Sequence, residues 1–195
     1  MNTKSPWFML IVAQGTTILG ASLVFPFYLI FIREVGASFT QFGLAYGLFT
    51  LSSAIVHRWI GTLTDYIGRV PFLVANAWGM ALLFLLLPIV TAIWQVYALQ
   101  ILLGIFGAMQ KTSEKALLAD LTEYRSRGQR IGRYHFWTAI SSGLAIIGGG
   151  MLIDFFTLDI IFYTGSIILF ISGWVMLGIV EPFRLSDTNT KEGTH

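Results

Sequence analysis

Six long apolar segments constrain this chain more than any other feature of its sequence. They cover residues 7–32, 39–60, 72–90, 94–119, 134–153 and 160–180. A helix rises about 1.5 Å per residue, so each segment can cross the ~30 Å hydrocarbon core of a bilayer. Ser38 with Gln41 fits a capping box at the start of the second segment, and Pro71 fits the first turn of the third. The sequence therefore predicts an all-α membrane protein with six transmembrane helices, because an open sheet would leave backbone groups unpaired in lipid.

The composition agrees with a chain that resides in a lipid bilayer. Hydrophobic residues make up 55% of the 195 residues and charged residues 11%, whereas a typical soluble domain is about 25% charged. The first apolar segment is much longer than the core of a cleavable signal peptide, so we expect it to remain as a transmembrane helix. We expect residues 1–185 to form the six-helix domain and residues 186–195 to form a polar cytoplasmic tail.

No pattern in the sequence is typical of an enzyme or of a nucleic-acid-binding protein. The chain has no cysteine, and its histidines (His57, His135 and His195) are scattered, so we expect no metal site. Neither a phosphate-binding glycine loop nor a nucleophile elbow is present. We therefore expect no cofactor and no catalytic residue. The basic residues lie in short gaps between spans and do not form a face that nucleic acid would bind.

The distribution of lysine and arginine predicts the orientation. With the N-terminus inside, Arg33 would lie outside, and the inner side would hold Lys4, Arg58, Arg69, Lys111, Lys115, Arg125, Arg127, Arg130, Arg133, Arg184 and Lys191. Such a bias is typical of cytoplasmic loops, so both termini are predicted in the cytoplasm of a multi-pass protein of the cell (plasma) membrane. An interfacial aromatic belt is expected from Trp7, Trp59, Tyr66, Trp94, Tyr134 and Trp137.

Small residues spaced four apart predict where helices approach closely. Such residues let helix backbones pack where no hydrophobic force drives association. We expect packing between helices at three places: Gly43 with Gly47, Gly104 with Ala108, and Ser141 with Ala145 and Gly149.

The gap between the second and third segments carries a distinctive set of residues: Gly61, Leu63, Asp65, Gly68 and Arg69. Two glycines seven residues apart permit a tight reversal of the chain. Asp65 is expected just before a helix N-terminus, where free N–H groups favour a carboxylate. Arg69 supplies a cation to a neighbouring acid or to lipid headgroups. The alternative is an ordinary inside loop whose basic residues only set the topology.

This gap resembles the signature loop between helices two and three of the major facilitator superfamily, whose pattern is roughly Gly-x-Leu-x-Asp-Arg-x-Gly-Arg-Arg. The five residues named above match it, whereas Tyr66 and Val70 replace two basic positions. Residues 119–128 look like that family's exit from helix four. The resemblance covers the chain as the N-terminal half of a twelve-helix transporter. It implies that Asp65 and Arg69 stabilise one conformation by contacting the other half.

An internal repeat agrees with this half-domain. Gly150, Leu152 and Asp154 repeat the Gly-x-Leu-x-Asp spacing after the fifth segment, on the opposite side of the membrane. Inverted repeats of three helices each occur within each half of these transporters. The expected fold is therefore a six-helix bundle with a 3+3 inverted repeat, which is half of a major facilitator fold.

The resemblance also implies which residues line a solute cavity, because helices one, two, four and five of this half line it in the family. Gln14, Tyr46 and Gln100 are the main candidates, with Thr17 and Ser142 beside them. The alternative for each is a hydrogen bond to a neighbouring helix.

Departures from the family's patterns argue against proton-coupled drug export. Gln100 stands where some members carry an arginine, and Ala145 and Ile146 replace the Gly-Pro of the antiporter signature. No charged residue lies at the middle of a predicted span, so the sequence shows no evident proton-coupling carboxylate.

Three charged residues lie one to two turns inside the end of the fourth segment. Lys111 and Glu114 are three apart and are expected to pair on one helix face. Their stems and that of Lys115 can also extend to the inner interface. A cytoplasmic vestibule that attracts anions is the alternative.

The leading hypothesis is one half of a secondary transporter that moves a small solute by alternating access. Two alternatives stay open: a six-span partner protein that does not transport, and a truncated remnant of a longer transporter. The expected partner is a second six-helix half, either a separate chain or a second copy. Without it, Gln14, Tyr46 and Gln100 would meet lipid with their polar groups unpaired. The solute, the direction of transport and the coupling ion are left open.

Overall fold

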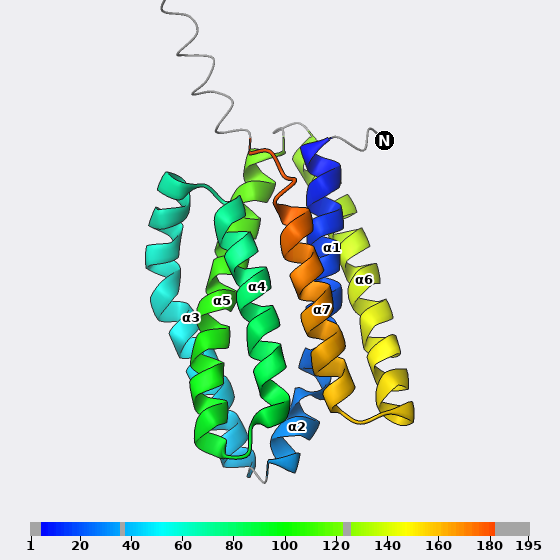
Figure 1. Cartoon of the computed structure of the whole chain (residues 1–195). Helices are drawn as coiled ribbons and strands as arrows, with labels where there is room; N and C mark the ends of the chain where they lie inside the picture. The colour runs from blue at the N-terminus through cyan, green and yellow to red at the C-terminus, as the bar shows by residue number, and fades with distance from the viewer. Residues whose placement is uncertain (1–4, 36–37, 123–125, 182–195) are drawn as a thin grey trace, which may run out of the picture.

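The structure is a computed structural model that describes residues 5–35, 38–122 and 126–181. Long helices form a bundle (Figure 1). They are α1 (Pro6–Val24), η1 (Phe25–Phe27), α2 (Tyr28–Glu34), α3 (Phe39–Ile67), α4 (Val70–Leu86), η2 (Leu87–Ile89), α5 (Ile93–Asp120), α6 (Arg127–Phe155) and α7 (Asp159–Met176). Within the described residues, six helical stretches are long and apolar enough to cross a membrane, with α1 to α2 counted as one. The predicted all-α fold with six spans is confirmed.

Local sequence signals explain several helix boundaries. The Gln41 N–H donates to Ser38 Oγ and the Ser38 N–H donates to Gln41 Oε1 at 2.8 Å, so the expected capping box is present. Pro71 lies in the first turn of α4, as expected. Pro26 lies in η1, the 3-10 turn that separates α1 from α2. A proline there lacks the N–H that a continuous helix would use.

Two helices extend further than their apolar segments predict. The α3 helix continues to Ile67 instead of ending near residue 60, and α6 begins at Arg127 instead of near residue 134. Both have 29 residues, about 44 Å at about 1.5 Å per residue. They are therefore longer than the ~30 Å of hydrocarbon, and their polar turns can project beyond it.

The helix contacts follow the predicted inverted repeat. The main pairs are α3 with α5, α1 with α6, α4 with α5, α1 with α7, and α4 with α7. Spans one to three are α1 with α2, α3 and α4, and spans four to six are α5, α6 and α7. Replacing each span by its counterpart turns the α3–α5 pair into α6–α1 and the α1–α7 pair into α5–α4, and it leaves α4–α7 unchanged. The helices therefore form a row in the order α3, α5, α4, α7, α1 and α6, with α3 and α6 at its two ends (Figure 1).

One end of the bundle carries most of the described basic residues. The α3–α4 connection lies there, together with the start of α1 and the end of α7 (Figure 1). We call it the basic end, because Arg69, Lys115, Arg127 and Arg130 lie near it, whereas Arg33 lies at the other end of the bundle. Lys4, Glu123, Arg125, Arg184, Lys191 and the predicted tail 186–195 lie outside the described residues.

Two clusters of apolar side chains form the core. One contains Ile32, Phe84, Leu103 and Phe162, and the other, toward the basic end, contains Leu10, Leu73, Leu117 and Tyr134. Tyr134 is fully buried, so its predicted place in an interfacial belt is wrong. The reason is that its ring packs in the second cluster and its hydroxyl donates to Glu114 of α5.

The helices at the ends of the row are the least buried. In the most apolar window of α3 only 11% of the residues are buried, and in α6 only 17%, against 50% in α1 to α2. Each end helix packs mainly on one neighbour, which leaves the rest of its surface open. Lipid tolerates such apolar surface, because it is as apolar as the side chains.

The small residues behave in two ways. Gly104 of α5 and Gly149 of α6 pack closely on neighbouring helices, as predicted. Gly43 and Gly47 of α3 have open space where a side chain would be, so no helix of this bundle packs on this pair. Spacing alone does not show which side of an end helix has a neighbour.

Candidate functional site

The segment that resembles the signature loop is mostly helical. Gly61, Leu63 and Asp65 lie in the last two turns of α3 and not in a loop. The chain reverses at Gly68 and Arg69. Gly68 has φ 106° and ψ 166°, a region that essentially only glycine populates. The reversal therefore needs one glycine, not two.

Arg69 joins the ends of three helices. Its Nη2 donates to Asp65 Oδ1 at 2.9 Å, and its Nη1 donates to the Thr64 carbonyl oxygen at 2.7 Å. Its Nε lies 3.1 Å from Asp120 Oδ2 at the end of α5. The Arg69 side chain is 13% exposed and that of Asp65 is 68% exposed. Arg69 thus anchors α3 and α4 to α5, while Asp65 remains open to a further partner.

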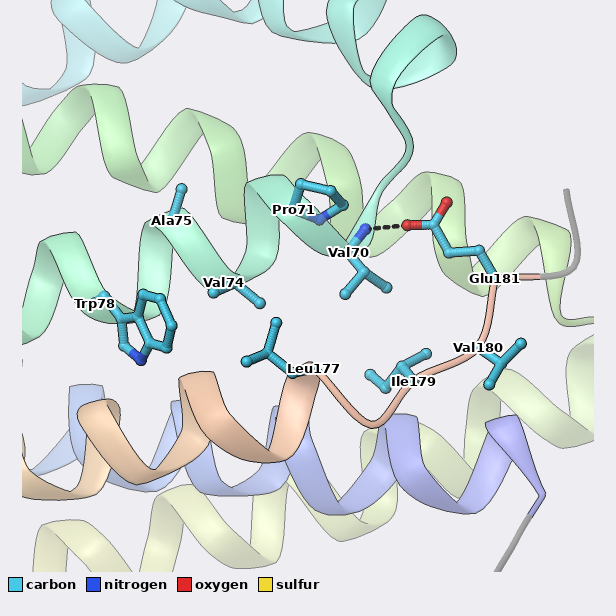
Figure 2. A pocket seen from close by; sticks show the side chains of 9 residues that line it. All are labelled: Val70, Pro71, Val74, Ala75, Trp78, Leu177, Ile179, Val180 and Glu181. Atoms are coloured by element: carbon cyan, nitrogen blue, oxygen red, sulfur yellow. Dashed lines mark hydrogen bonds between the residues drawn. The ribbon is translucent and has the colours of Figure 1, made fainter. Parts of the chain in front are cut away.

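Glu181, not Asp65, occupies the N-terminus of α4. Its Oε1 accepts a hydrogen bond from the Val70 N–H at 2.5 Å (Figure 2), and Glu181 is buried. A Cβ at Gly68 would lie 2.7 Å from Glu181 Oε2. The predicted position of Asp65 at a helix N-terminus is therefore wrong, because α3 continues past it.

A cavity of about 620 Å³ lies beside this contact, between α4 and the segment that follows α7 (Figure 2). Most of its lining is apolar, including Val74, Trp78, Leu177 and Ile179. The carboxylate of Glu181, its charged residue, already accepts a hydrogen bond from Val70. This cavity therefore offers little to a polar solute.

Gln14 belongs to a polar network that joins four helices. Gln110 of α5 donates to Gln14 Oε1 of α1 at 2.6 Å and accepts from Asn76 Nδ2 of α4 at 2.9 Å. Glu114 accepts from the Tyr134 hydroxyl of α6 at 2.5 Å and from Gln110 Nε2 at 3.3 Å. Gln14 is fully buried. The expectation that it would meet lipid without a second bundle is wrong, because Gln14 is buried inside this bundle. Its Oε1 accepts from Gln110, whereas its Nε2 forms no hydrogen bond with the described residues.

The two secondary candidates also bond neighbouring helices. The hydroxyls of Thr17 and Ser172 are 2.6 Å apart and link α1 to α7. The hydroxyls of Ser142 and Ser22 are 2.8 Å apart and link α6 to α1. These contacts favour the packing interpretation for both residues.

Tyr46 and Gln100 line one cavity of about 470 Å³, together with Lys111. Tyr46 is 58% exposed, whereas Gln100 is 3% exposed and so, like Gln14, would not meet lipid. The ring of Tyr46 stacks between Phe42 and Phe49, with centroid distances of 6.4 and 5.9 Å. We call the surface that carries this cavity the open face. The structure thus brings together Tyr46 and Gln100 but not Gln14.

Comparison with known protein families shows to which family this chain belongs. The model of the Major Facilitator Superfamily matches residues 10–195. The chain belongs to the major facilitator superfamily.

Relatives within this superfamily differ in length. The chain is 50% identical over 157 residues to the uncharacterized MFS-type transporter YitZ of Bacillus subtilis (strain 168), covering 80% of this chain and 96% of YitZ. It is 32% identical over 170 residues to multidrug resistance protein MdtG of Proteus mirabilis (strain HI4320), covering 83% of this chain and 41% of MdtG. It is 32% identical over 137 residues to the class B tetracycline resistance protein of Escherichia coli, covering 69% of this chain and 33% of that protein. The chain thus spans well under half of the latter two.

The charged residues of α5 depart from the predicted pairing in this major facilitator chain. Glu114 bonds to Tyr134 and Gln110, and the ion pairs found among the described residues involve Arg69 and not Lys111. Lys111 instead lines the cavity of the open face. The predicted Lys111–Glu114 pair is therefore wrong.

A second, smaller cavity of about 270 Å³ lies between α5 and α6 toward the basic end. Its ionisable residues are Lys111, Glu114, Lys115, Arg127 and His135. Among the described residues, no group of three or more histidine, cysteine, aspartate or glutamate side chains could hold a metal ion.

Three residues of these sites were not among the predicted ones: Asn76, Gln110 and Glu181. Asn76 and Gln110 are polar residues within apolar spans, which is itself a signal of function or of bonding between helices. Gln110 also lies four residues before Glu114, on the same helix face. Glu181 has no such local signal, because its partner Val70 is 111 residues away.

Proposed function

We propose that this chain forms one wall of a solute pathway and moves a small solute by alternating access together with a second six-helix half. Membership of the superfamily supports transport. Two relatives are named for resistance to tetracycline and to multiple drugs, which fits a small organic solute. The observation that carries the proposal is the open face, where the exposed Tyr46 and the buried Gln100 share one cavity.

The need for a second half follows from the helices at the ends of the row. Both α3 and α6 are largely unburied, and Gly43 and Gly47 of α3 leave open space beside them. Transport of the family type uses two bundles that rock about a site between them. A separate chain or a second copy can supply the other bundle. A two-fold axis along the membrane normal would bring the same faces of two copies together.

The signature segment is proposed to act as a gate through Gly61, Asp65, Gly68 and Arg69. Arg69 holds α3 to Asp120 of α5, whereas Asp65 is 68% exposed at the basic end. An exposed carboxylate on an anchored helix end can contact a second half in one conformation and release it in the other. The stability of the bundle itself would then depend little on Asp65.

The orientation proposed for the bundle places the basic end and both termini in the cytoplasm, with the protein in the plasma membrane. The sequence-wide bias of lysine and arginine supports it. Single cysteines at Tyr66, Thr91 and Thr157 test it, because the chain has no cysteine and all three residues are exposed. An impermeant thiol reagent outside intact cells should label positions 91 and 157. Strong labelling at position 66 would reverse the orientation.

Alternating access can be tested without knowing the solute. A cysteine at Tyr46 should react with an impermeant thiol reagent from either side of the membrane, because the cavity opens to each side in turn. A cysteine at Ala13, which is fully buried, should react from neither side and serves as the control. Labelling of position 46 from one side only would favour a partner protein that does not transport.

Assembly is tested by measuring mass in lipid nanodiscs by light scattering. The expected particle holds two six-helix halves, either two copies or this chain with another. A strictly monomeric particle that still labels from both sides would refute the need for a second half. A chain that forms no stable particle would favour a truncated remnant.

A further inference from the structure

Lys111 places a positive charge on the open face, inside the span formed by α5. It lies nine residues before the end of α5 at Asp120, about 14 Å along the axis at about 1.5 Å per residue. A charge at such depth is costly in lipid, and charged residues inside spans usually mark a solute or ion path. Lys111 lines both the open-face cavity of about 470 Å³ and the cavity of about 270 Å³ between α5 and α6. It is therefore placed where a solute in the cavity of the open face would meet it.

No described acid neutralises Lys111 by direct contact. Glu114, one turn away, has its two carboxylate oxygens bonded to neutral side chains. His57 of α3 contacts the Thr112 hydroxyl at 2.8 Å, beside Lys111. The other basic or weakly basic side chains around the smaller cavity are Lys115, Arg127 and His135. Lys111 and Lys115 together face one carboxylate, Glu114, in the lining of the smaller cavity, so the formal charge of these three residues is positive.

The cavity of the open face adds an aromatic wall and the buried hydroxyl of Tyr28. Phe42, Tyr46 and Phe49 stack along α3. Tyr28, only 6% exposed, also lines the cavity. Its hydroxyl lies near the Gln100 side chain, but the two groups do not reach full hydrogen-bond geometry, and no other described group bonds this hydroxyl. A buried hydroxyl without a partner is costly, and a ligand in the cavity would supply one.

We propose that the solute held on the open face is an organic anion. Its apolar body would lie against the aromatic wall of α3, its carboxylate or phosphate group would pair with Lys111, and one of its acceptors would bond the Tyr28 hydroxyl. This inference rests on the proposed transport function, and it specifies the class of solute. An anionic lipid headgroup has the same acidic chemistry, so the experiment must separate the two sources.

The test is a binding measurement with two matched aromatic probes. The chain is placed in nanodiscs of phosphatidylcholine, which has no net charge, and titrated with 2-naphthoate or with its neutral amide, 2-naphthamide. Naphthoate should bind at least about tenfold more tightly, because hydrogen bonds to charged groups are the stronger ones. Equal binding of the two probes, or no binding of naphthoate, would overturn the proposal.

Substitutions of Lys111 and Lys115 test which lysine pairs with the carboxylate of naphthoate. Lys111→Gln should weaken naphthoate binding about tenfold and leave naphthamide unchanged, and Lys111→Arg should keep most of the affinity. Lys115→Gln is the matched control, because Lys115 lies on the same helix but lines only the smaller cavity. It should change affinity by about threefold or less, since a charge out of contact is screened. An equal loss in both glutamine variants would refute the role of Lys111.

Nanodiscs that contain phosphatidylglycerol test whether Lys111 binds an anionic lipid headgroup instead of a solute. If the solute is the natural occupant, naphthoate still binds there, and Lys111→Gln does not change the amount of phosphatidylglycerol that copurifies. If Lys111 instead holds a headgroup, the variant loses bound phosphatidylglycerol and the solute assignment is wrong. Binding is measured apart from transport. If position 46 is labelled from both sides but naphthoate does not bind, only this inference is overturned. If naphthoate binds but position 46 is labelled from one side only, only the transport proposal is overturned.

Discussion

Two parts of the molecule carry the same small-residue spacing but have opposite surroundings. Gly104 of α5 faces α3, where an added Cβ would overlap Ser52 Oγ and the Phe49 carbonyl oxygen. Gly43 and Gly47 of α3 lie four residues apart as well, yet no atom lies within 4 Å of an added Cβ at either position. The first site is a closed seam within the bundle, and the second is an open surface.

The difference shows that small residues in a membrane helix indicate where a backbone can approach closely, but they do not indicate which helix packs there. In lipid there is no hydrophobic force between helices, so small residues are useful wherever backbones must approach. At Gly104 that approach is already made within this chain. At Gly43 and Gly47 we infer that it awaits the second half.

Gly104→Leu should have the largest effect on stability. Its side chain would enter the backbone of α3, and overpacking typically costs 1–3 kcal/mol and sometimes more, so we expect about 3 kcal/mol or more. The expected result is low abundance and a much lower unfolding temperature in mild detergent, followed by tryptophan fluorescence. Gly43→Leu is the control and should unfold near the parent. If both variants lose the same stability, the contrast between seam and surface is wrong.

Gly68→Ala should rank second. Only glycine tolerates its backbone angles, at a cost for other residues of about 1–3 kcal/mol, and the new Cβ would crowd Glu181. Gly61→Ala is the matched control within the same signature segment. Gly61 is helical with open space beside it, so alanine there should leave stability unchanged or raise it by up to about 1 kcal/mol. Thermal unfolding of both variants checks the pair, and a destabilised Gly61→Ala would contradict the helical end of α3.

Asp65→Asn should change stability little but alter the gate. Asp65 is 68% exposed, and exposed ion pairs contribute about 0.2–1 kcal/mol. We expect abundance close to that of the parent, with labelling of a cysteine at position 46 shifted toward one side of the membrane. Asp120→Asn is the comparison, because it removes the partner that anchors Arg69 to α5. An unchanged two-sided labelling ratio in Asp65→Asn would count against a gating role.

Gly47→Leu should have the smallest effect on the folded bundle. Surface changes usually fall within about 0.5 kcal/mol, and open space surrounds this residue. The bulky side chain should instead weaken assembly, which light scattering in nanodiscs would show as a shift toward the single bundle. Gly47→Ala should assemble normally. A Gly47→Leu chain that assembles like the parent would remove α3 from the proposed interface.

The sequence by itself determined the membrane class, the six spans and the family resemblance of the signature segment. These features are local or periodic: a run of about 20 apolar residues must be helical in lipid, and capping signals such as Ser38 with Gln41 act within one turn. The repeat at Gly150, Leu152 and Asp154 is likewise visible as spacing, and the symmetric helix contacts agree with it.

Only the tertiary structure decided which polar residues face a solute and which bond other helices. Gln14, Tyr46 and Gln100 are similar as sequence candidates, yet Gln14 bonds to Gln110 on another helix, whereas Tyr46 and Gln100 line a cavity beside Lys111. Glu181 reaches Val70 across 111 residues. A hydrogen bond or a cavity depends on the distance between helices that are far apart in the chain, and that distance is set by packing and not by any local pattern.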